Sequence, residues 1–227
     1  MKRISNLKIS EQGLEAKGKN GRWCPILLLQ GDMDGACSVY SLMMDLILIR
    51  TINRSDVVFR KNTDGRKSKG RLLHEFLDKH GLIATGFKFD EVKSLLQSSF
   101  LKVVTSEYID EDNILGRIKT SIDDDMPIII GIDFNKDNGH ALVAIGYDID
   151  EDSNISEIYC LDPDQPKTNI GYWNAVIKVN EFKNIQIPFD MRSVIPAICG
   201  HSFFKYFYGC KVNVLNRYLG RQTVFFC

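Results

Sequence analysis

The stretch from Ala36 to Arg50 is apolar on nearly every face, and this feature constrains the fold most strongly. A helix that is hydrophobic all round belongs in the middle of a protein, because it has no polar face to turn to water. The stretch follows a Gly- and Asp-rich turn at residues 31–35, and Cys37 stands at its start. The sequence therefore predicts a central helix that the rest of the chain covers, with a thiol in its first turn.

The segments before and after residue 125 differ in their hydrophobic pattern. Helical spacing of apolar residues predicts helices near 72–77, 90–96 and 111–122, with Asp90 as a cap and Gly81 as a stop. Alternating and β-branched segments predict strands over 126–134, 140–148, 155–162 and 172–180, together with a short strand at 101–104 and partly strand-like residues from 203 onward. Helices followed by a sheet indicate the α+β class.

The chain shows no repeat and no Pro- or Ser-rich linker, so we expect one domain over residues 1–227 with a polar arm at 1–20. The longest strongly apolar run, residues 39–49, is interrupted by Asp45 and is too short to span a bilayer. Lys+Arg and Asp+Glu both number 29, and this balance gives no general attraction to nucleic acid. We therefore expect neither a membrane nor a nucleic-acid partner, and we interpret the basic residues 60–71 as a solvated loop.

The six cysteines are irregularly spaced, and the N-terminus has no apolar signal segment. This pattern favours reduced thiols in a protein made in the cytoplasm. Cys199, His201 and Cys210 could be taken for zinc ligands, but their spacing matches no common site and a fourth ligand is missing. We expect no metal and no cofactor.

Acyl transfer by a thiol needs a thiolate, a base and donors for an oxyanion. Cys37 meets the first need, because the N-terminus of a helix favours a negative charge. Gln30, just upstream, offers a neutral side-chain donor. The ordinary alternative for Cys37 is a buried structural cysteine.

His140 is the candidate base, because it enters an apolar segment from a polar Asn-Gly turn and so lies at the edge of the predicted sheet. Asp162 ends the next predicted strand, and a hairpin would return it opposite His140, where a carboxylate orients an imidazole. His74, His80 and His201 lack such a setting. A single histidine is more often structural. The hypothesis therefore rests on the order Gln, Cys, His and Asp along the chain.

Three segments together resemble the papain-like cysteine peptidases, in particular the bacterial branch that includes the bacteriocin leader-processing peptidases: QGDMDGACSVYSLMM, MPIIIGIDFNKDNGHALVAIGYD and IYCLDPD. The resemblance implies a papain-like two-lobed α+β fold, in which a central helix with the nucleophile packs on an antiparallel sheet with His and Asp. It implies Cys37 as nucleophile, His140 as base and acid, Asp162 as orienting residue and Gln30 as oxyanion donor.

The expected activity is cleavage of a peptide bond in a protein or peptide substrate, through a thioester acyl-enzyme. A deamidase or acyltransferase with the same triad, and a catalytically silent papain-like binding module, stay open as alternatives. Only 29 residues precede Gln30, which leaves no room for a long inhibitory pro-segment. We therefore expect restraint by narrow specificity or by a cognate inhibitor, as for a bacterial toxin or effector delivered into another cell, unless the chain is a trimmed piece.

Overall fold

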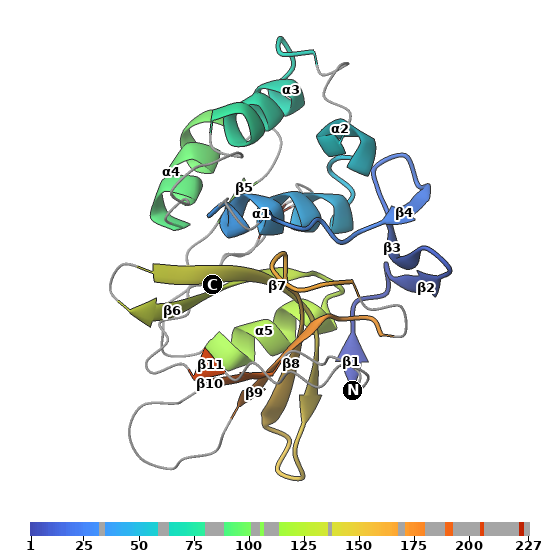
Figure 1. The fold of residues 1–227 in the computed structure, drawn as a ribbon, viewed down its shortest axis with the longest axis vertical. Helices are drawn as coiled ribbons and strands as arrows, with labels where there is room; N and C mark the ends of the chain where they lie inside the picture. Colours follow the sequence, from blue (N-terminus) through green and yellow to red (C-terminus); the bar gives the residue numbers. More distant parts are fainter. Residues whose placement is uncertain are drawn as a thin grey trace.

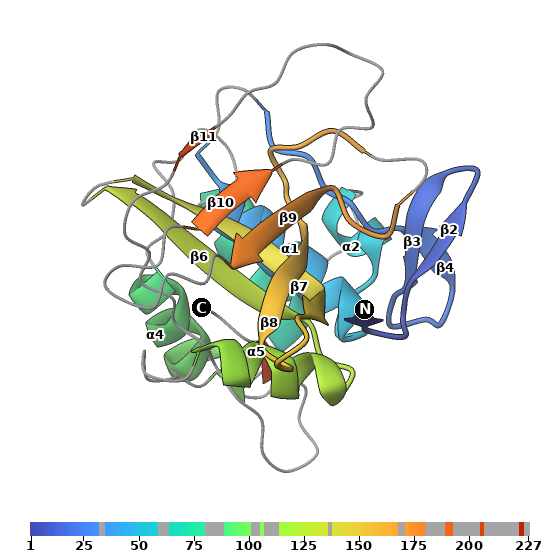
Figure 2. The same ribbon diagram turned by 90° about the horizontal axis from the view of Figure 1, so that it is seen from below.

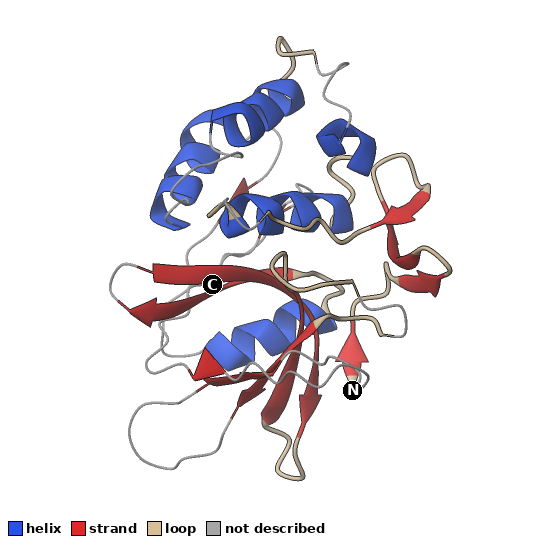
Figure 3. Ribbon diagram, viewed as in Figure 1, coloured by secondary structure: helices blue, strands red, loops and turns tan. Residues whose placement is uncertain are grey.

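The computed structural model places the central helix between other helices and a curved sheet (Figure 1). It describes residues 1–31, 35–58, 64–79, 89–100, 105–106, 114–135, 138–167, 171–179, 189–192, 205–206 and 223–224. In Figure 3 the helices of residues 37–99 gather on one side of the sheet, and α5 (Ile114–Asp123) lies on its other side. The predicted α+β class, with a helix packed on an antiparallel sheet, is confirmed.

Helix α1 spans Cys37–Leu48 and confirms the predicted central helix. Five apolar side chains of this helix are fully buried: Leu42, Met43, Met44, Leu46 and Ile47. Burial of each such side chain contributes roughly 1.5–3 kcal/mol of hydrophobic stabilisation. The same helix contains buried polar side chains, of which Ser41 and Asp45 are completely covered. The helix therefore lies where the sequence places it, in the core, with some polar groups enclosed alongside the apolar ones.

The main sheet is centred on a long strand, β7 (Asn138–Ile149), which pairs with neighbours on both edges. The four strands predicted between residues 126 and 180 form within a few residues of their expected bounds: β6 (Ile128–Asn135), β7, β8 (Ile155–Leu161) and β9 (Ala175–Val179). Beyond β9 the sheet continues through β10 (Phe189–Arg192) and β11 (Lys205–Tyr206), and every pairing is antiparallel. Figure 2 shows β8, β9 and β10 side by side. Helix α1 packs against β7 and β6, which brings its first turn close to the start of β7.

The N-terminal residues contain strands that the sequence pattern did not predict. β1 (Lys2–Arg3) pairs with β7 at Gly146 and Tyr147. A separate antiparallel sheet has the order β2 (Lys8–Ser10), β3 (Gly13–Lys17) and β4 (Trp23–Pro25). The segment expected as a polar arm thus adds buried side chains to the core: Ile4, Leu7, Leu14 and Ala16. These strands are too short to show a clear alternation in the sequence.

The remaining helices are α2 (Arg54–Val58), α3 (Ser68–Leu73), a π-helical segment at His74–Lys79, α4 (Phe89–Ser99) and α5. The three predicted helices are confirmed, but Asp90 lies inside α4 instead of capping it. The predicted loop at 60–71 is partly wrong, because Ser68 begins α3 and Lys69 binds Asp56 at 2.9 Å.

Some predictions fall on residues that the structure leaves undescribed: Gly81, the strand at 101–104, residues 60–63 and most of the chain after 192. Next to the predicted strand at 101–104, β5 (Thr105–Ser106) pairs in parallel with β12 (Thr223–Val224). Within the described ranges, no helix is both long enough and apolar enough to cross a bilayer.

Candidate active site

Cys37 is the first residue of α1, and its thiol is free and half-buried. The helix begins after Ala36, whose own side chain has no group that could cap the first turn. The partial positive charge of this helix end faces the surroundings of Cys37. This is an environment that suits a sulfur atom carrying negative charge.

His140 lies near the start of β7, paired with Ile132 of β6, and its side chain is 11% exposed. The Nε2–H group donates to Oδ1 of Asp162 at 2.7 Å. The ring is also hydrogen-bonded to the Cys37 side chain. Since Nε2 serves Asp162, Nδ1 is the ring nitrogen left for the sulfur. The imidazole thus bridges the helix and the sheet.

Asp162 directly follows β8 and its side chain is 1% exposed. The hairpin with β7 forms as predicted, but its register places Leu161 opposite Val143, so Asp162 lies diagonal to His140 instead of opposite it. The difference is set at the turn, where Ile149 pairs with Ile155; the two irregularities further along the ladder cancel each other. Diagonal neighbours in a sheet are still within reach of each other's side chains, and the contact forms.

The charge state of His140 follows from opposing effects. Burial of the ring lowers its pKa, but the hydrogen bonds to Asp162 and Cys37, with the charges of both groups, outweigh burial and raise the pKa to about 10. His140 is therefore an imidazolium across the neutral pH range. A buried cation that sits between a thiol and a carboxylate can stabilise a thiolate and can release a proton on demand.

Gln30 is held by the turn that follows Asp162. Its backbone N–H donates to the carbonyl of Pro163 at 2.9 Å, and its Nε2 donates to Oδ1 of Asp164 at 3.4 Å. The backbone N–H of Asp164 in turn donates to Oδ1 of Asp162 at 2.8 Å. An amide nitrogen has two hydrogens, so Nε2 keeps one for another acceptor. The same turn therefore contacts both Gln30 and the carboxylate that binds His140.

A model of the Peptidase_C39 like family matches residues 33–187, more than half of the chain. The chain belongs to this family. It is a cysteine-type peptidase with a protein or peptide substrate, and the expected resemblance to bacteriocin-processing-related peptidases is confirmed. The matched range includes Cys37, His140 and Asp162, whereas Gln30 precedes it. A comparison with curated proteins finds no match.

The other thiols of this C39-like peptidase differ from Cys37. Burial raises the pKa of Cys160 well above its ordinary value, so this thiol is a poor nucleophile. Cys24 is half-buried, and its Sγ–H donates to the carbonyl of Ala16 at 3.5 Å. The described residues hold no cluster of potential metal ligands, and the candidate zinc ligands considered above, Cys199 among them, lie outside those residues.

Two residues that hold the site of this peptidase in place, Ser41 and Asn174, were not predicted from the sequence. Ser41, one helical turn after Cys37, donates its hydroxyl to the carbonyl of Ala141 at 3.0 Å and ties α1 to β7. Asn174 makes hydrogen bonds to the backbone of Asp162. A serine inside an apolar helix and an asparagine inside the predicted strand at 172–180 were the available signals. Neither signal is specific enough to predict these contacts.

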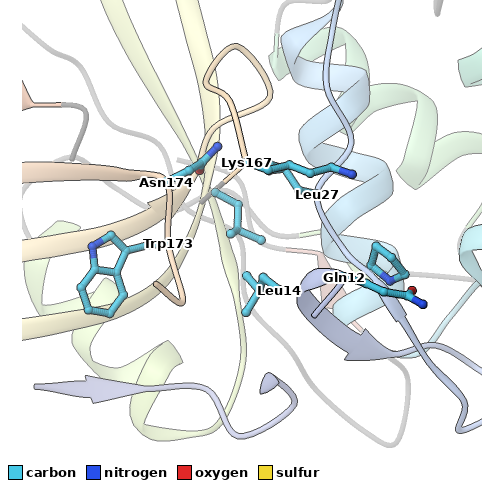
Figure 4. A pocket seen from close by; sticks show the side chains of 8 residues that line it. Gln12, Leu14, Leu27, Lys167, Trp173 and Asn174 are labelled. Atoms are coloured by element: carbon cyan, nitrogen blue, oxygen red, sulfur yellow. The ribbon is translucent and has the colours of Figure 1, made fainter. Parts of the chain in front are cut away.

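A pocket lies beside this network, between the β2–β3 hairpin and the segment after β8 (Figure 4). The side chains labelled in the figure come from both sides: Gln12, Leu14, Leu27, Lys167, Trp173 and Asn174. Leu161, which precedes Asp162, also lines it. The pocket therefore borders the backbone of the segment that carries the carboxylate.

Proposed function

We propose that Cys37, His140 and Asp162 form the catalytic triad with which this peptidase cleaves a peptide bond, and that Gln30 stabilises the oxyanion. The observation that carries the proposal is the continuous hydrogen-bonded chain from the Cys37 side chain through the imidazole to Asp162. The position of the ring supports it, because the imidazole interacts with both the Cys37 side chain and the Asp162 carboxylate. The burial of the pair supports it as well, since a dry site strengthens electrostatic interactions.

The first half-reaction uses the imidazolium as an acid. The Cys37 thiolate attacks the carbonyl carbon, so a C–S bond forms and the carbonyl oxygen becomes an oxyanion. The backbone N–H of Cys37 and Nε2 of Gln30 donate to that oxyanion. When the C–N bond breaks, His140 gives its proton to the leaving amine. The products are a free amine and a thioester on Cys37.

The second half-reaction uses the same ring as a base. Neutral His140 takes a proton from water while the water oxygen attacks the thioester carbonyl. The C–S bond then breaks, which releases the carboxylic acid and restores the thiolate beside an imidazolium. Asp162 keeps the ring in one orientation throughout and stabilises its charged form.

The first test is selective alkylation with iodoacetamide at mildly acidic pH, followed by peptide mass spectrometry. We expect fast modification of Cys37 alone, with Cys24 and Cys160 as internal references, and loss of this reactivity in His140→Ala. Ordinary thiols are mostly protonated and slow at this pH. Equal and slow labelling of all thiols would contradict the proposed triad.

The second test is a search for new N-termini after incubation with a library of proteome-derived peptides. Cys37→Ala and His140→Ala should abolish cleavage and leave the circular dichroism spectrum unchanged. Wild-type-like turnover in Cys37→Ala would contradict the assignment. Release of ammonia without a chain break would instead identify a deamidase.

We propose further that a cognate inhibitor restrains the peptidase, as would suit an effector delivered into another cell. The need to limit an active peptidase inside the cell that makes it is the reason for this prediction. The product of a neighbouring gene should bind the purified enzyme and block alkylation of Cys37. Failure of any neighbouring product to do so would end this part of the proposal.

A further inference from the structure

Asn174 stands directly before β9 and has a buried side chain, 4% exposed. The backbone ladder between β8 and β9 ends with Cys160 opposite Ala175. One residue further on, the backbone N–H of Asn174 donates to the carbonyl of Cys160 at 3.2 Å. Asp162 therefore lies two residues beyond Cys160, the last residue of β8 that the ladder pairs with β9.

The side chain of Asn174 makes the two hydrogen bonds to Asp162 that the backbone of a facing strand residue would make. Its Oδ1 accepts from the backbone N–H of Asp162 at 2.7 Å, and its Nδ2 donates to the carbonyl of Asp162 at 2.8 Å. This reciprocal pair is the pattern that two facing residues form in an antiparallel ladder. The second hydrogen of Nδ2 goes to the carbonyl of Gln165 at 3.0 Å. The side-chain amide thus holds both the start and the end of the turn at 162–165.

We propose that Asn174 is a positioning residue, which holds the backbone of Asp162 so that the carboxylate stays aligned with His140. This inference rests on the proposed roles of Asp162 and His140. It adds a residue that touches neither the substrate nor the reacting atoms.

The energetic argument starts from the orientation of the carboxylate. Oδ1 of Asp162 accepts from His140 and also from the backbone N–H of Asp164, which belongs to the same turn. Without Asn174, the buried backbone N–H of Asp162 loses its bond to Oδ1, and its carbonyl keeps only the 3.4 Å bond from the backbone N–H of Gln165. The turn then shifts to regain hydrogen bonds, and the carboxylate shifts with it.

Asn174 also lies between Asp162 and the pocket of Figure 4, which it lines. Truncation of its side chain extends this pocket toward the backbone of Asp162. Water that enters there can hydrogen-bond to the freed N–H and carbonyl groups, and it loosens the turn instead of restoring its geometry. Loss of Asn174 therefore weakens the pairing of Asp162 with His140.

The test compares Asn174→Ala and Asn174→Ser with matched variants of Asn6. Asn6 is a buried asparagine, 7% exposed, whose side chain also makes three hydrogen bonds to backbone, to the N–H and carbonyl of Lys17 and to the carbonyl of Leu48. Its contacts are remote from the proposed triad. Asn6→Ala and Asn6→Ser should therefore lower the stability of the protein to a similar extent without displacing the carboxylate of Asp162.

The first readout is the titration of the His140 ring by nitrogen-detected NMR, assigned with His140→Gln. In Asn174→Ala we expect the pKa of His140 to fall by about one unit or more, because the paired carboxylate no longer stabilises the charged ring. Asn174→Ser keeps one hydroxyl and should give a smaller shift, and it serves as the test if the alanine variant does not fold. The Asn6 variants should titrate like the wild type.

The second readout is kinetic, on any peptide that the wild type cleaves. A displaced carboxylate should lower kcat by up to roughly 100-fold with little change in KM. In an Asp162→Ala background, Asn174→Ala should cause almost no further loss of kcat, because its effect passes through Asp162. An equal loss in both backgrounds overturns the inference.

The outcomes separate this inference from the proposed function. A Cys37 that does not react with iodoacetamide in the wild type would contradict the proposed triad. A reactive wild type, together with an unchanged His140 titration in both Asn174 variants, overturns only the role of Asn174. A wild-type His140 that titrates near its ordinary pKa contradicts both.

Discussion

Nε2 of His140 and Oδ1 of Asp162 lie 2.7 Å apart, although the two residues occupy diagonal positions of the β7–β8 hairpin. The contact is buried, with the Asp162 side chain 1% exposed. A carboxylate in this setting has two separable effects on the ring: it fixes the orientation of the ring, and its negative charge stabilises the imidazolium.

Substitution of Asp162 separates these two effects. Asp162→Asn keeps an oxygen that accepts from Nε2 but removes the charge, so the pKa of His140 should fall and the alkaline limb of the pH–kcat profile should move to lower pH. Asp162→Ala removes orientation as well and should lower kcat by roughly 10- to 100-fold, a milder loss than in Cys37→Ala or His140→Ala. Identical profiles for wild type and Asp162→Asn would show that the charge has no role.

The raised pKa of His140 also predicts a pH dependence of stability. Between pH 6.5 and about 10 the folded protein holds a proton that the unfolded chain has released. The free energy of unfolding should therefore fall as pH rises through this window, by up to about 1.4 kcal/mol per pH unit, and the full contribution should remain below pH 6.5. Urea unfolding at pH 6, 8 and 10 measures the slope, which should be smaller in His140→Gln. Equal slopes in both proteins would contradict the raised pKa.

Loss of an oxyanion donor should act on kcat more than on KM. Gln30→Ala removes the Nε2 group and leaves the backbone bond to Pro163, so we expect a decrease in kcat of roughly 100- to 1,000-fold. Alkylation of Cys37 by iodoacetamide needs no oxyanion and should proceed as in the wild type. The control is Gln97→Ala, on the exposed face of α4, which should leave both rates unchanged. A normal kcat in Gln30→Ala would remove Gln30 from the mechanism.

Asp45 is a fully buried carboxyl group inside α1, and neither of its oxygens has a hydrogen-bond partner among the residues that the structure describes. Burial raises the pKa of Asp45 well above its ordinary value. Above pH 4 the folded protein therefore holds a proton that the unfolded chain releases, and stability falls as pH rises. Asp45→Asn should unfold at a higher temperature than wild type at pH 7, and the gain should vanish near pH 4.

The control for Asp45 is Asp152→Asn, in the exposed turn between β7 and β8, which should not change the pH dependence of the thermal midpoint. Calorimetric scans at pH 4, 5.5 and 7 provide the comparison. A lower midpoint for Asp45→Asn at pH 7 would mean that the carboxyl group stabilises the helix in its ionised form.

The sequence predicted the elements that depend on strong hydrophobic patterns. α1 and the four strands from β6 to β9 follow from long apolar or alternating segments, which few other structures can accommodate. The hairpin then brought Asp162 to His140. The expected register was wrong, because the turn pairs Ile149 with Ile155 and the polar residues 150–154 do not fix the point at which the chain reverses.

Contacts between distant segments were harder to predict. The strand β1 has two residues, and its place beside Gly146 depends on the finished sheet. The bond from Ser41 to Ala141 joins residues 100 positions apart. Asn174 resembles many asparagines that precede strands, and only the end of the β8–β9 ladder shows what its side chain replaces.

The order of the elements along the chain has a consequence for the synthesis of this enzyme. A ribosome completes α1 and its cysteine long before it reaches β8, Asp162 and the asparagine that precedes β9. A nascent or prematurely terminated chain therefore carries Cys37 without the other residues of the proposed triad. The proposed triad is complete only after β8 has been made, so the proposed activity can begin only late in synthesis.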